Sequence, residues 1–268
     1  MYESYWGLSL KPFENTPDPR FLYHAPQHEE GLSRLLYVVR EGKGAGLLTG
    51  VYGCGKTLLG RTLLRELERD VYRVSFVTNP RLDDTEMLRM IAHGLGVSEL
   101  PTRKTDVWIA LEKVFLENIR DGRKTVVVID EAHAIEDPRL FEELRLLLNF
   151  QTEDRFLLTL ILMGQPELQP KVDNNKQLAQ RIAMRFHLEA LSAPEVRAYI
   201  DHRMKVAGAG HPVFTPEACQ LIFERSGGIP RRVNHICDMA LLAGFGKSLR
   251  AIDRDVAREA IDGLGASL

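Results

Sequence analysis

Short apolar runs alternate along this chain with longer segments in which apolar residues recur every three or four positions. The runs have the length and β-branched character of buried strands and lie at 45–49, 71–78, 124–129, 157–163 and 186–189. The segments between them have helical periodicity and lie at 28–41, 57–68, 84–94, 105–120, 140–150 and 176–184. Strands separated by helices predict an α/β fold with a parallel sheet.

The two ends of the chain differ from this middle part. The first 23 residues are rich in aromatics and prolines, which predicts an extended arm lying on an apolar surface. After Leu191 the strand signals stop, and the pattern predicts helices at 194–207, 216–226, 231–243 and 254–264. We therefore expect an N-terminal arm over 1–27, an α/β domain over 28–191 and a small helical domain over 192–268.

Composition narrows the class of protein without identifying it. The chain is 44% hydrophobic and 27% charged, as is usual for soluble globular proteins, and its net charge of −2 gives no global attraction to nucleic acid. Three widely spaced cysteines favour a reducing compartment over a disulfide framework or a zinc site. The apolar run at 157–163 is too short to span a bilayer, and the first residues do not form a secretory signal. We expect a cytoplasmic protein.

A glycine-rich string, Gly-x4-Gly-Lys-Thr, follows the first predicted strand and opens a predicted helix. In that setting backbone N–H groups curl around the β-phosphate of a nucleotide, and the helix N-terminus adds its positive dipole end. Lys56 is expected to reach the β- and γ-phosphates, and the Thr57 hydroxyl to ligate Mg²⁺. A chance glycine-rich turn is the alternative, which the strand–loop–helix setting disfavours. The residues expected to bind ATP are Gly50, Val51, Tyr52, Gly53, Cys54, Gly55, Lys56, Thr57 and Leu58.

An acidic pair follows the apolar strand at 124–129. Asp130 would lie at the carboxyl edge of the sheet, where it can hold magnesium through water, and Glu131 would polarise the attacking water as general base. Such a pair also occurs at ordinary strand ends, but here it shares a chain with a phosphate loop. His133 completes the string Asp-Glu-Ala-His. No other helicase motif is visible, so a packing or capping histidine remains open.

Several motifs spread over nearly the whole chain resemble the ExeA/GspA family of AAA+ ATPases. They comprise the end of the arm, Thr16-Pro17-Asp18-Pro19-Arg20-Phe21-Leu22-Tyr23, the phosphate loop and Asp-Glu-Ala-His, together with Leu144-Arg145-Leu146-Leu147-Leu148-Asn149, Gly164-Gln165-Pro166-Glu167-Leu168 and Gly228-Ile229-Pro230-Arg231-Arg232-Val233-Asn234. The resemblance implies a five-stranded parallel sheet in the order 5-1-4-3-2, a helical lid, and a ring-like homo-oligomer working around ATP.

The same resemblance implies roles for polar residues that follow two strands. Gln165 stands at the position of sensor 1, which touches the γ-phosphate or the water, and its amide both donates and accepts. A turn residue before Pro166 is the alternative. Asn79 matches the position that can hold the catalytic glutamate away from its water, and a turn residue before Pro80 is again the alternative.

Three arginines receive roles in the same way. Arg181 stands where the family places the arginine finger that reaches a neighbouring subunit's γ-phosphate, with Arg185 as the rival and a solvated charge as the plain alternative. Arg231 opens a lid helix and resembles sensor 2, which contacts nucleotide and reports its state to the lid. The arm residues Phe13 and Phe21, together with Tyr23, either cover the adenine face or pack in a core.

The biological process is open at this point. The resemblance favours an ATPase that drives secretion or envelope assembly with a partner protein, while full-length family members continue into a membrane span and a periplasmic module beyond the part matched here. The chain would then reach the inner face of the inner membrane through a partner or a missing span. The alternatives are a DNA-binding regulator of transposition, a small-molecule kinase, and a nucleotide switch with little turnover.

Overall fold

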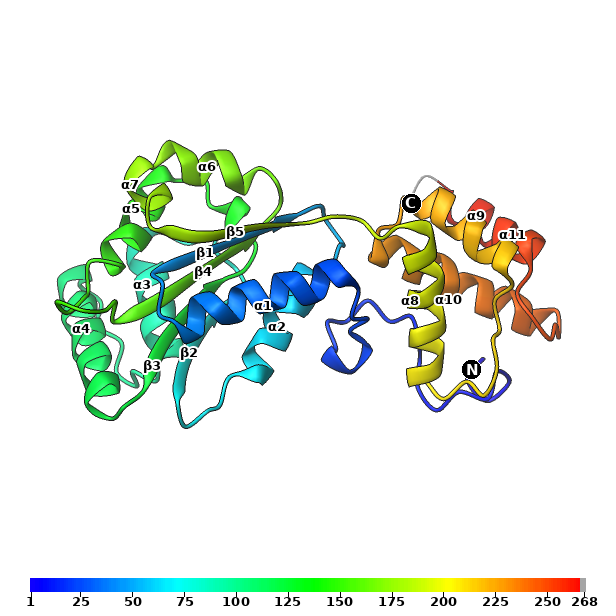
Figure 1. Ribbon diagram of the computed structural model, residues 1–268, viewed down its shortest axis with the longest axis horizontal. Coiled ribbons are helices and arrows are strands. Elements are labelled where there is room, and N and C mark those ends of the chain that lie inside the picture. The colour runs from blue at the N-terminus through cyan, green and yellow to red at the C-terminus, as the bar shows by residue number, and fades with distance from the viewer. Residues whose placement is uncertain (266–268) are drawn as a thin grey trace. The chain divides into compact units, whose positions relative to one another are not determined.

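The computed structural model describes residues 1–265 and contains one five-stranded parallel sheet in the order β2-β3-β4-β1-β5 (Figure 1). Its strands are β1 (Ala45–Gly50), β2 (Tyr72–Val77), β3 (Lys124–Ile129), β4 (Leu158–Gly164) and β5 (Ile182–Leu188). This order, taken from the other edge of the sheet, is the predicted 5-1-4-3-2. The predicted α/β fold is confirmed.

The three central strands are almost wholly buried, which explains their unbroken apolar sequences. Strands β2 and β5 lie at the edges and are only partly buried, so polar side chains such as Arg73, Arg185 and His187 are tolerated there. The register places Thr49 opposite Gly164 and Ile129 opposite Leu162. The carboxyl ends of β1, β3 and β4 therefore meet at one edge.

Helices cover both faces of the sheet (Figure 1). The later parts of α1 (Pro26–Arg40) and α2 (Lys56–Glu66) pack on one face, where a Cβ added to Gly60 would lie 2.6 Å from the terminal methyl of Met163. A helix carrying a larger residue at that point could not approach the sheet so closely. The opposite face packs against α3 (Asp84–Gly94), α4 (Lys104–Arg120) and α5 (Pro138–Leu147).

A second compact unit contains residues 1–28, 52–58 and 189–265 of the described chain. Its helices are α8 (Ala193–Val206), α9 (Pro216–Ser226), α10 (Pro230–Gly246) and α11 (Arg254–Leu264). Residues 29–51 and 59–188 form the other unit, which contains the sheet. The segment 52–58 thus groups with the helices, although the residues on either side of it in sequence belong to the sheet unit. The predicted domain boundaries at 27/28 and 191/192 stay predictions.

The N-terminal arm forms part of the core of this helical unit. Its buried side chains include Trp6, Phe13 and Phe21, which belong to the same apolar cluster as the residues of α8 to α11. The Trp6 indole donates to the carbonyl oxygen of Leu241 (3.1 Å), and Arg203 donates through Nε to the carbonyl oxygen of Pro12 (2.5 Å). The expectation that the arm lies on an apolar surface is confirmed, although the arm includes a 3₁₀ turn, η1 (Pro19–Phe21).

The helix predicted over 176–184 exists as α7 (Lys176–Ala179), but its predicted end is wrong, because β5 begins at Ile182. A further short helix, α6 (Leu168–Asn174), precedes it. Asn175 starts α7 by accepting the N–H of Leu178, and pairing with β1 then draws the following residues into an edge strand. Tertiary pairing overrides a local helical preference here.

No helix among residues 1–265 is long and apolar enough to cross a bilayer. Cys54, Cys219 and Cys237 are free and buried.

Candidate active site

Three predicted site residues of the sheet unit lie where strands end at one edge. Gly50 closes β1, Asp130 follows β3, and Gln165 follows β4. Since β1, β4 and β3 are neighbours in parallel register, the three positions come together at the carboxyl edge. Ligand sites of open α/β sheets are found outside this edge.

The phosphate loop has the backbone conformation that its glycines predict. Gly53 and Gly55 have φ values of 84° and 104°, a region that disfavours side chains, and α2 begins directly afterwards at Lys56. Lys56 and Thr57 thus lie in the first turn of a helix whose N-terminal N–H groups provide an anion site. The Lys56 side chain is buried, with Nζ 3.9 Å from Sγ of Cys54.

The first turn of α10 packs directly on this loop. The Arg231 N–H donates to the carbonyl oxygen of Gly53 (3.2 Å), and a Cβ on Gly53 would lie 2.8 Å from Cβ of Arg231. The Arg231 guanidinium lies 4.4 Å from the ring centroid of Tyr52 and donates to its hydroxyl. The predicted sensor 2 residue therefore contacts the phosphate loop through both backbone and side chain.

His28 supports the loop from another side, and the sequence pattern did not identify it. Its buried ring donates through Nε2 to the carbonyl oxygen of Cys54 (3.2 Å), and a Cβ on Gly55 would lie 3.3 Å from the same nitrogen. Burial raises the pKa of the Cys54 thiol, so this side chain is a neutral packing group in the loop. A histidine in the first turn of a helix, here α1, carries no local signal for such a role.

A small cavity of about 30 Å³ lies beside the loop. Tyr23 and His28 line it together with Cys54, Gly55 and Leu58. Of the aromatic residues considered for the adenine face, only Tyr23 lines this cavity, whereas Phe13 and Phe21 pack in the helical core. The core-packing alternative holds for those two.

The acidic pair occupies a tight turn at the end of β3. Asp130 is 2% exposed, and its Oδ1 accepts the N–H of Glu131 (2.9 Å). Glu131 has φ 53° and ψ 28°, a left-handed conformation that is uncommon for a residue with a side chain. The turn continues into η2 (Ala132–Ala134) and leaves the Glu131 carboxylate 38% exposed. A buried carboxylate thus stands next to an accessible one.

His133 lies between the acidic pair and Gln165. The Gln165 N–H donates to Nδ1 of His133 (3.3 Å), and the side-chain amide nitrogen of Gln165 lies 2.9 Å from Nε2 of the same ring. Nε2 is also 3.5 Å from Oε2 of Glu131. The structure therefore brings Gln165 together with two residues of the Asp-Glu-Ala-His string, which the sequence treated as a separate motif.

Arg181 and Arg185 lie on different parts of β5. Arg181 precedes the strand, at the amino edge of the sheet, and donates to the carbonyl oxygen of Arg145 (3.1 Å) and to Oδ1 of Asn149 (2.6 Å). Partial burial, then the charge of Arg145, lowers its pKa from the ordinary value, although a guanidinium remains charged at neutral pH. Arg185, within the strand, pairs with Asp173 at 2.8 Å.

Asn79 follows β2 and its Oδ1 accepts the N–H of Arg81 (3.3 Å). This bond is the local contact of a turn residue.

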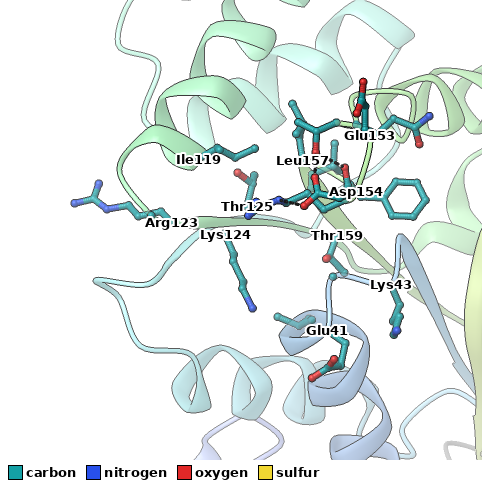
Figure 2. Close-up of a pocket in the computed structure, with 18 residues that line it drawn as sticks. Glu41, Lys43, Ile119, Arg123, Lys124, Thr125, Glu153, Asp154, Leu157 and Thr159 are labelled. Carbon is teal, nitrogen blue, oxygen red and sulfur yellow. Dashed lines mark hydrogen bonds and ion pairs between the residues drawn. The ribbon is translucent and has the colours of Figure 1, made fainter.

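A large hollow of about 760 Å³ lies elsewhere on the sheet unit (Figure 2). It is lined by the segments before β1, β3 and β4, including Lys43, Arg123, Lys124, Glu153 and Asp154. These segments meet at the amino edge, a strand length away from Asp130 and Gln165. This hollow is thus distinct from the predicted nucleotide site.

A buried parallel sheet of order 5-1-4-3-2, a strand–loop–helix phosphate cradle and an acidic pair at the carboxyl edge together define a P-loop NTPase of the AAA+ class. Residues 39–172, half of the chain, match the family model described as "AAA domain". The chain belongs to this family and is an ATPase by class.

The resemblance to the ExeA/GspA family is also confirmed. General secretion pathway protein A of Aeromonas hydrophila is 40% identical over 258 residues, covering 94% of this chain and 46% of that protein. The chain thus spans about half the length of this curated relative.

Two solved structures share the fold. The ORC2 protein of Aeropyrum pernix, in ADPNP and ADP complexes, aligns with a TM-score of 0.71 at 18% identity, over 94% of this chain and 71% of that one. The Aeropyrum pernix ORC1 protein in complex with DNA gives 0.70 at 20% identity, over 95% and 69%. At these identities the similarity concerns the fold.

The contact between Gly53 and Arg231 leads to a first prediction. Gly53→Ala should weaken ATP binding at least tenfold, because the new methyl group meets Arg231 and a positive φ costs a further 1–2 kcal/mol or so. Titration with a fluorescent ATP analogue measures the effect.

Gly42→Ala is the matched control. Gly42 also has a positive φ, of 59°, but a Cβ there has nothing within 4 Å. Equal losses of binding in the two variants would mean that general destabilisation, rather than the shape of the loop, causes the effect.

Proposed function

We propose that this chain binds Mg·ATP through residues 50–58 and hydrolyses it with Glu131 as general base, working in an oligomer. The observation that carries the proposal is the common edge at which Gly50, Asp130 and Gln165 follow three neighbouring strands. Nucleotide binding by a phosphate loop does not require an acidic residue with an accessible carboxylate. ATP hydrolysis does require one, because water must be activated next to the γ-phosphate.

The residues present fit magnesium. Among residues 1–265 no three His, Cys, Asp or Glu side chains gather into a metal cage. Mg²⁺ usually binds one or two protein oxygens and completes its shell with water and substrate phosphates. The Thr57 hydroxyl and the Asp130 carboxylate are donors of that kind, and the ion would neutralise charge that develops on the phosphates.

The proposed roles of the remaining residues follow from their positions. Gln165 would contact the γ-phosphate or the attacking water as sensor 1, and Arg231 would connect nucleotide to lid as sensor 2. Arg231 already contacts the phosphate loop through Gly53 and Tyr52, which supports that role. Lys56 would contact the β- and γ-phosphates.

Arg181 is proposed as a finger that acts on a neighbouring subunit. It precedes β5, whereas Asp130 and Gln165 follow β3 and β4. A strand of seven residues spans about 20 Å, so Arg181 lies too far from the catalytic edge of its own sheet to act there. Arg185 is paired with the charged carboxylate of Asp173, whereas Arg181 donates to uncharged oxygens, which makes Arg185 the weaker candidate.

The process proposed for this ATPase is secretion or assembly of the cell envelope, with a protein partner. The support is the 40% identity to General secretion pathway protein A over nearly all of this chain. ATP turnover would be converted into conformational work between the phosphate loop and the helices that contact it.

Two variants separate nucleotide binding from hydrolysis. Lys56→Ala should weaken ATP binding about 100-fold, because it removes a charge facing two phosphates. Glu131→Gln should bind ATP normally and lose turnover by 10²- to 10⁴-fold or so. Binding by equilibrium dialysis and phosphate release measure the two effects. Loss of binding in both variants would show that Glu131 is not the general base.

The finger is tested by mixing variants. Arg181→Ala should bind ATP nearly normally and lose about 10³-fold in turnover. Mixed with Lys56→Ala it should recover part of the activity, because one variant supplies an intact pocket and the other an intact finger. Arg185→Ala is the control and should be milder. A mixture that stays inactive while mixed oligomers form would disprove action in trans.

Duplex DNA distinguishes the two processes. If the chain works in secretion, affinity for duplex DNA should be weak at physiological salt with or without ATP, as the net charge of −2 leads us to expect. Fluorescence anisotropy measures it. A complex of nanomolar affinity that tightens with ATP would favour a DNA regulator instead.

A further inference from the structure

We propose that His133 is a positioning residue of the ATPase reaction, which orients the Gln165 amide and holds the Glu131 carboxylate. The inference rests on the proposed roles of Gln165 as sensor and Glu131 as base. The contacts that carry it are three: Gln165 N–H to Nδ1 at 3.3 Å, the Gln165 amide to Nε2 at 2.9 Å, and Glu131 Oε2 to Nε2 at 3.5 Å.

Lys171 holds the backbone that carries the His133 ring. Lys171 donates to the carbonyl oxygens of His133 (2.5 Å) and Ile135 (2.7 Å), which fixes the turn η2 against α6. A Cβ on Gly164 would lie 3.0 Å from the His133 nitrogen and 3.2 Å from Nδ1. The glycine that ends β4 therefore allows the imidazole to lie against the strand that carries Gln165.

The hydrogen bond from Gln165 determines the tautomer of His133. A backbone N–H only donates, so Nδ1 must accept and carries no proton. In a neutral imidazole the proton is then on Nε2. His133 consequently presents an N–H donor toward the Gln165 amide and the Glu131 carboxylate.

This tautomer also determines which end of the Gln165 amide faces the ring. In the structure both ring nitrogens face N–H donors, because the amide nitrogen of Gln165 lies 2.9 Å from Nε2. A neutral imidazole accepts at one nitrogen only, and the backbone N–H cannot turn away from Nδ1, whereas the side-chain amide can turn. A half-turn of the amide therefore brings its oxygen to Nε2–H and turns the NH₂ group outward. The two orientations differ by a half-turn about the last side-chain bond, and nothing intrinsic to glutamine selects one. An outward NH₂ is a donor available to a phosphate oxygen or to the attacking water. His133 thus makes sensor 1 a donor.

The Nε2–H group of His133 also restrains the Glu131 carboxylate. Its backbone is in the left-handed region, and its carboxylate is 38% exposed, whereas the His133 side chain is only 17% exposed. A rather rigid neighbour with an N–H pointing to Oε2 reduces the freedom of a carboxylate that is otherwise solvated. Misplacement of a catalytic group by about 1 Å can cost 100-fold in rate.

Two substitutions test the acceptor at Nδ1 and the donor at Nε2 of His133 separately. In His133→Asn the side-chain oxygen takes the place of Nδ1 and still accepts the Gln165 N–H, but the donor at the Nε2 position is lost. In His133→Gln the amide reaches the Nε2 position and restores a donor there. We expect kcat to fall 10- to 100-fold in the Asn variant and to be at least fivefold higher in the Gln variant than in the Asn variant, with KM for ATP within threefold of wild type in both.

Controls distinguish positioning from packing. Thermal melts should place both variants close to wild type, and His211→Asn, at an exposed site, should not change kcat. Equal losses in the Asn and Gln variants, or a rise in KM instead of a fall in kcat, would overturn the inference and leave His133 a packing residue.

A double-mutant test separates this inference from the proposed function. In a Gln165→Ala background, His133→Asn should reduce kcat no more than about threefold, because its main target is gone. If Gln165→Ala alone leaves kcat unchanged, the sensor role fails. If Gln165→Ala lowers kcat but His133→Asn does not, only the His133 inference fails.

The tautomer provides a readout that is independent of turnover. With ¹⁵N-labelled histidine at pH 8, the His133 signals, identified by their loss in His133→Asn, should show a protonated Nε2 and a bare Nδ1. A proton on Nδ1 would contradict the hydrogen bond from Gln165 and with it the inference.

Discussion

Backbone hydrogen bonds join β1 to β4 and β4 to β3 in one parallel register, with Thr49 opposite Gly164 and Ile129 opposite Leu162. Because parallel strands all end on the same side, whatever follows them in sequence is collected there. The sheet itself therefore brings the site residues together, because they lie in three short turns at one edge. Changing the register by one pair would separate Gln165 from the turn that carries Glu131 and His133.

Much of this arrangement could be predicted from the sequence because the signals are local. Buried central strands require unbroken apolar runs, so β3 was bounded correctly at Lys124–Ile129, and the periodicity of α3 gave Asp84–Gly94 without error. The glycines of the phosphate loop were informative because positive φ values demand them. The acidic pair was singled out because it comes directly after a strand, whereas Gln165 was assigned from the family resemblance.

Other features depend on contacts that no local pattern encodes. The edge strand β5 has polar side chains, so its beginning was mistaken for a helix, and only pairing with β1 decides it. The stacking of Arg231 on Tyr52 joins residues from distant segments. The contact between His133 and Gln165 likewise depends on two strands being neighbours, and the letters Asp-Glu-Ala-His gave no indication of it.

The arm has a consequence for synthesis on the ribosome. Trp6, Phe13 and Phe21 are translated well before the helices that bury them, which begin only with α8, after roughly 170 further residues. At 5–20 residues per second this leaves the aromatic segment without its native partners for about 10–40 s. During that time the segment is a natural target for chaperones that hold exposed aromatic chain. The sheet unit can fold during this interval, whereas the helical unit can fold only after its N-terminal and C-terminal segments have both been synthesised.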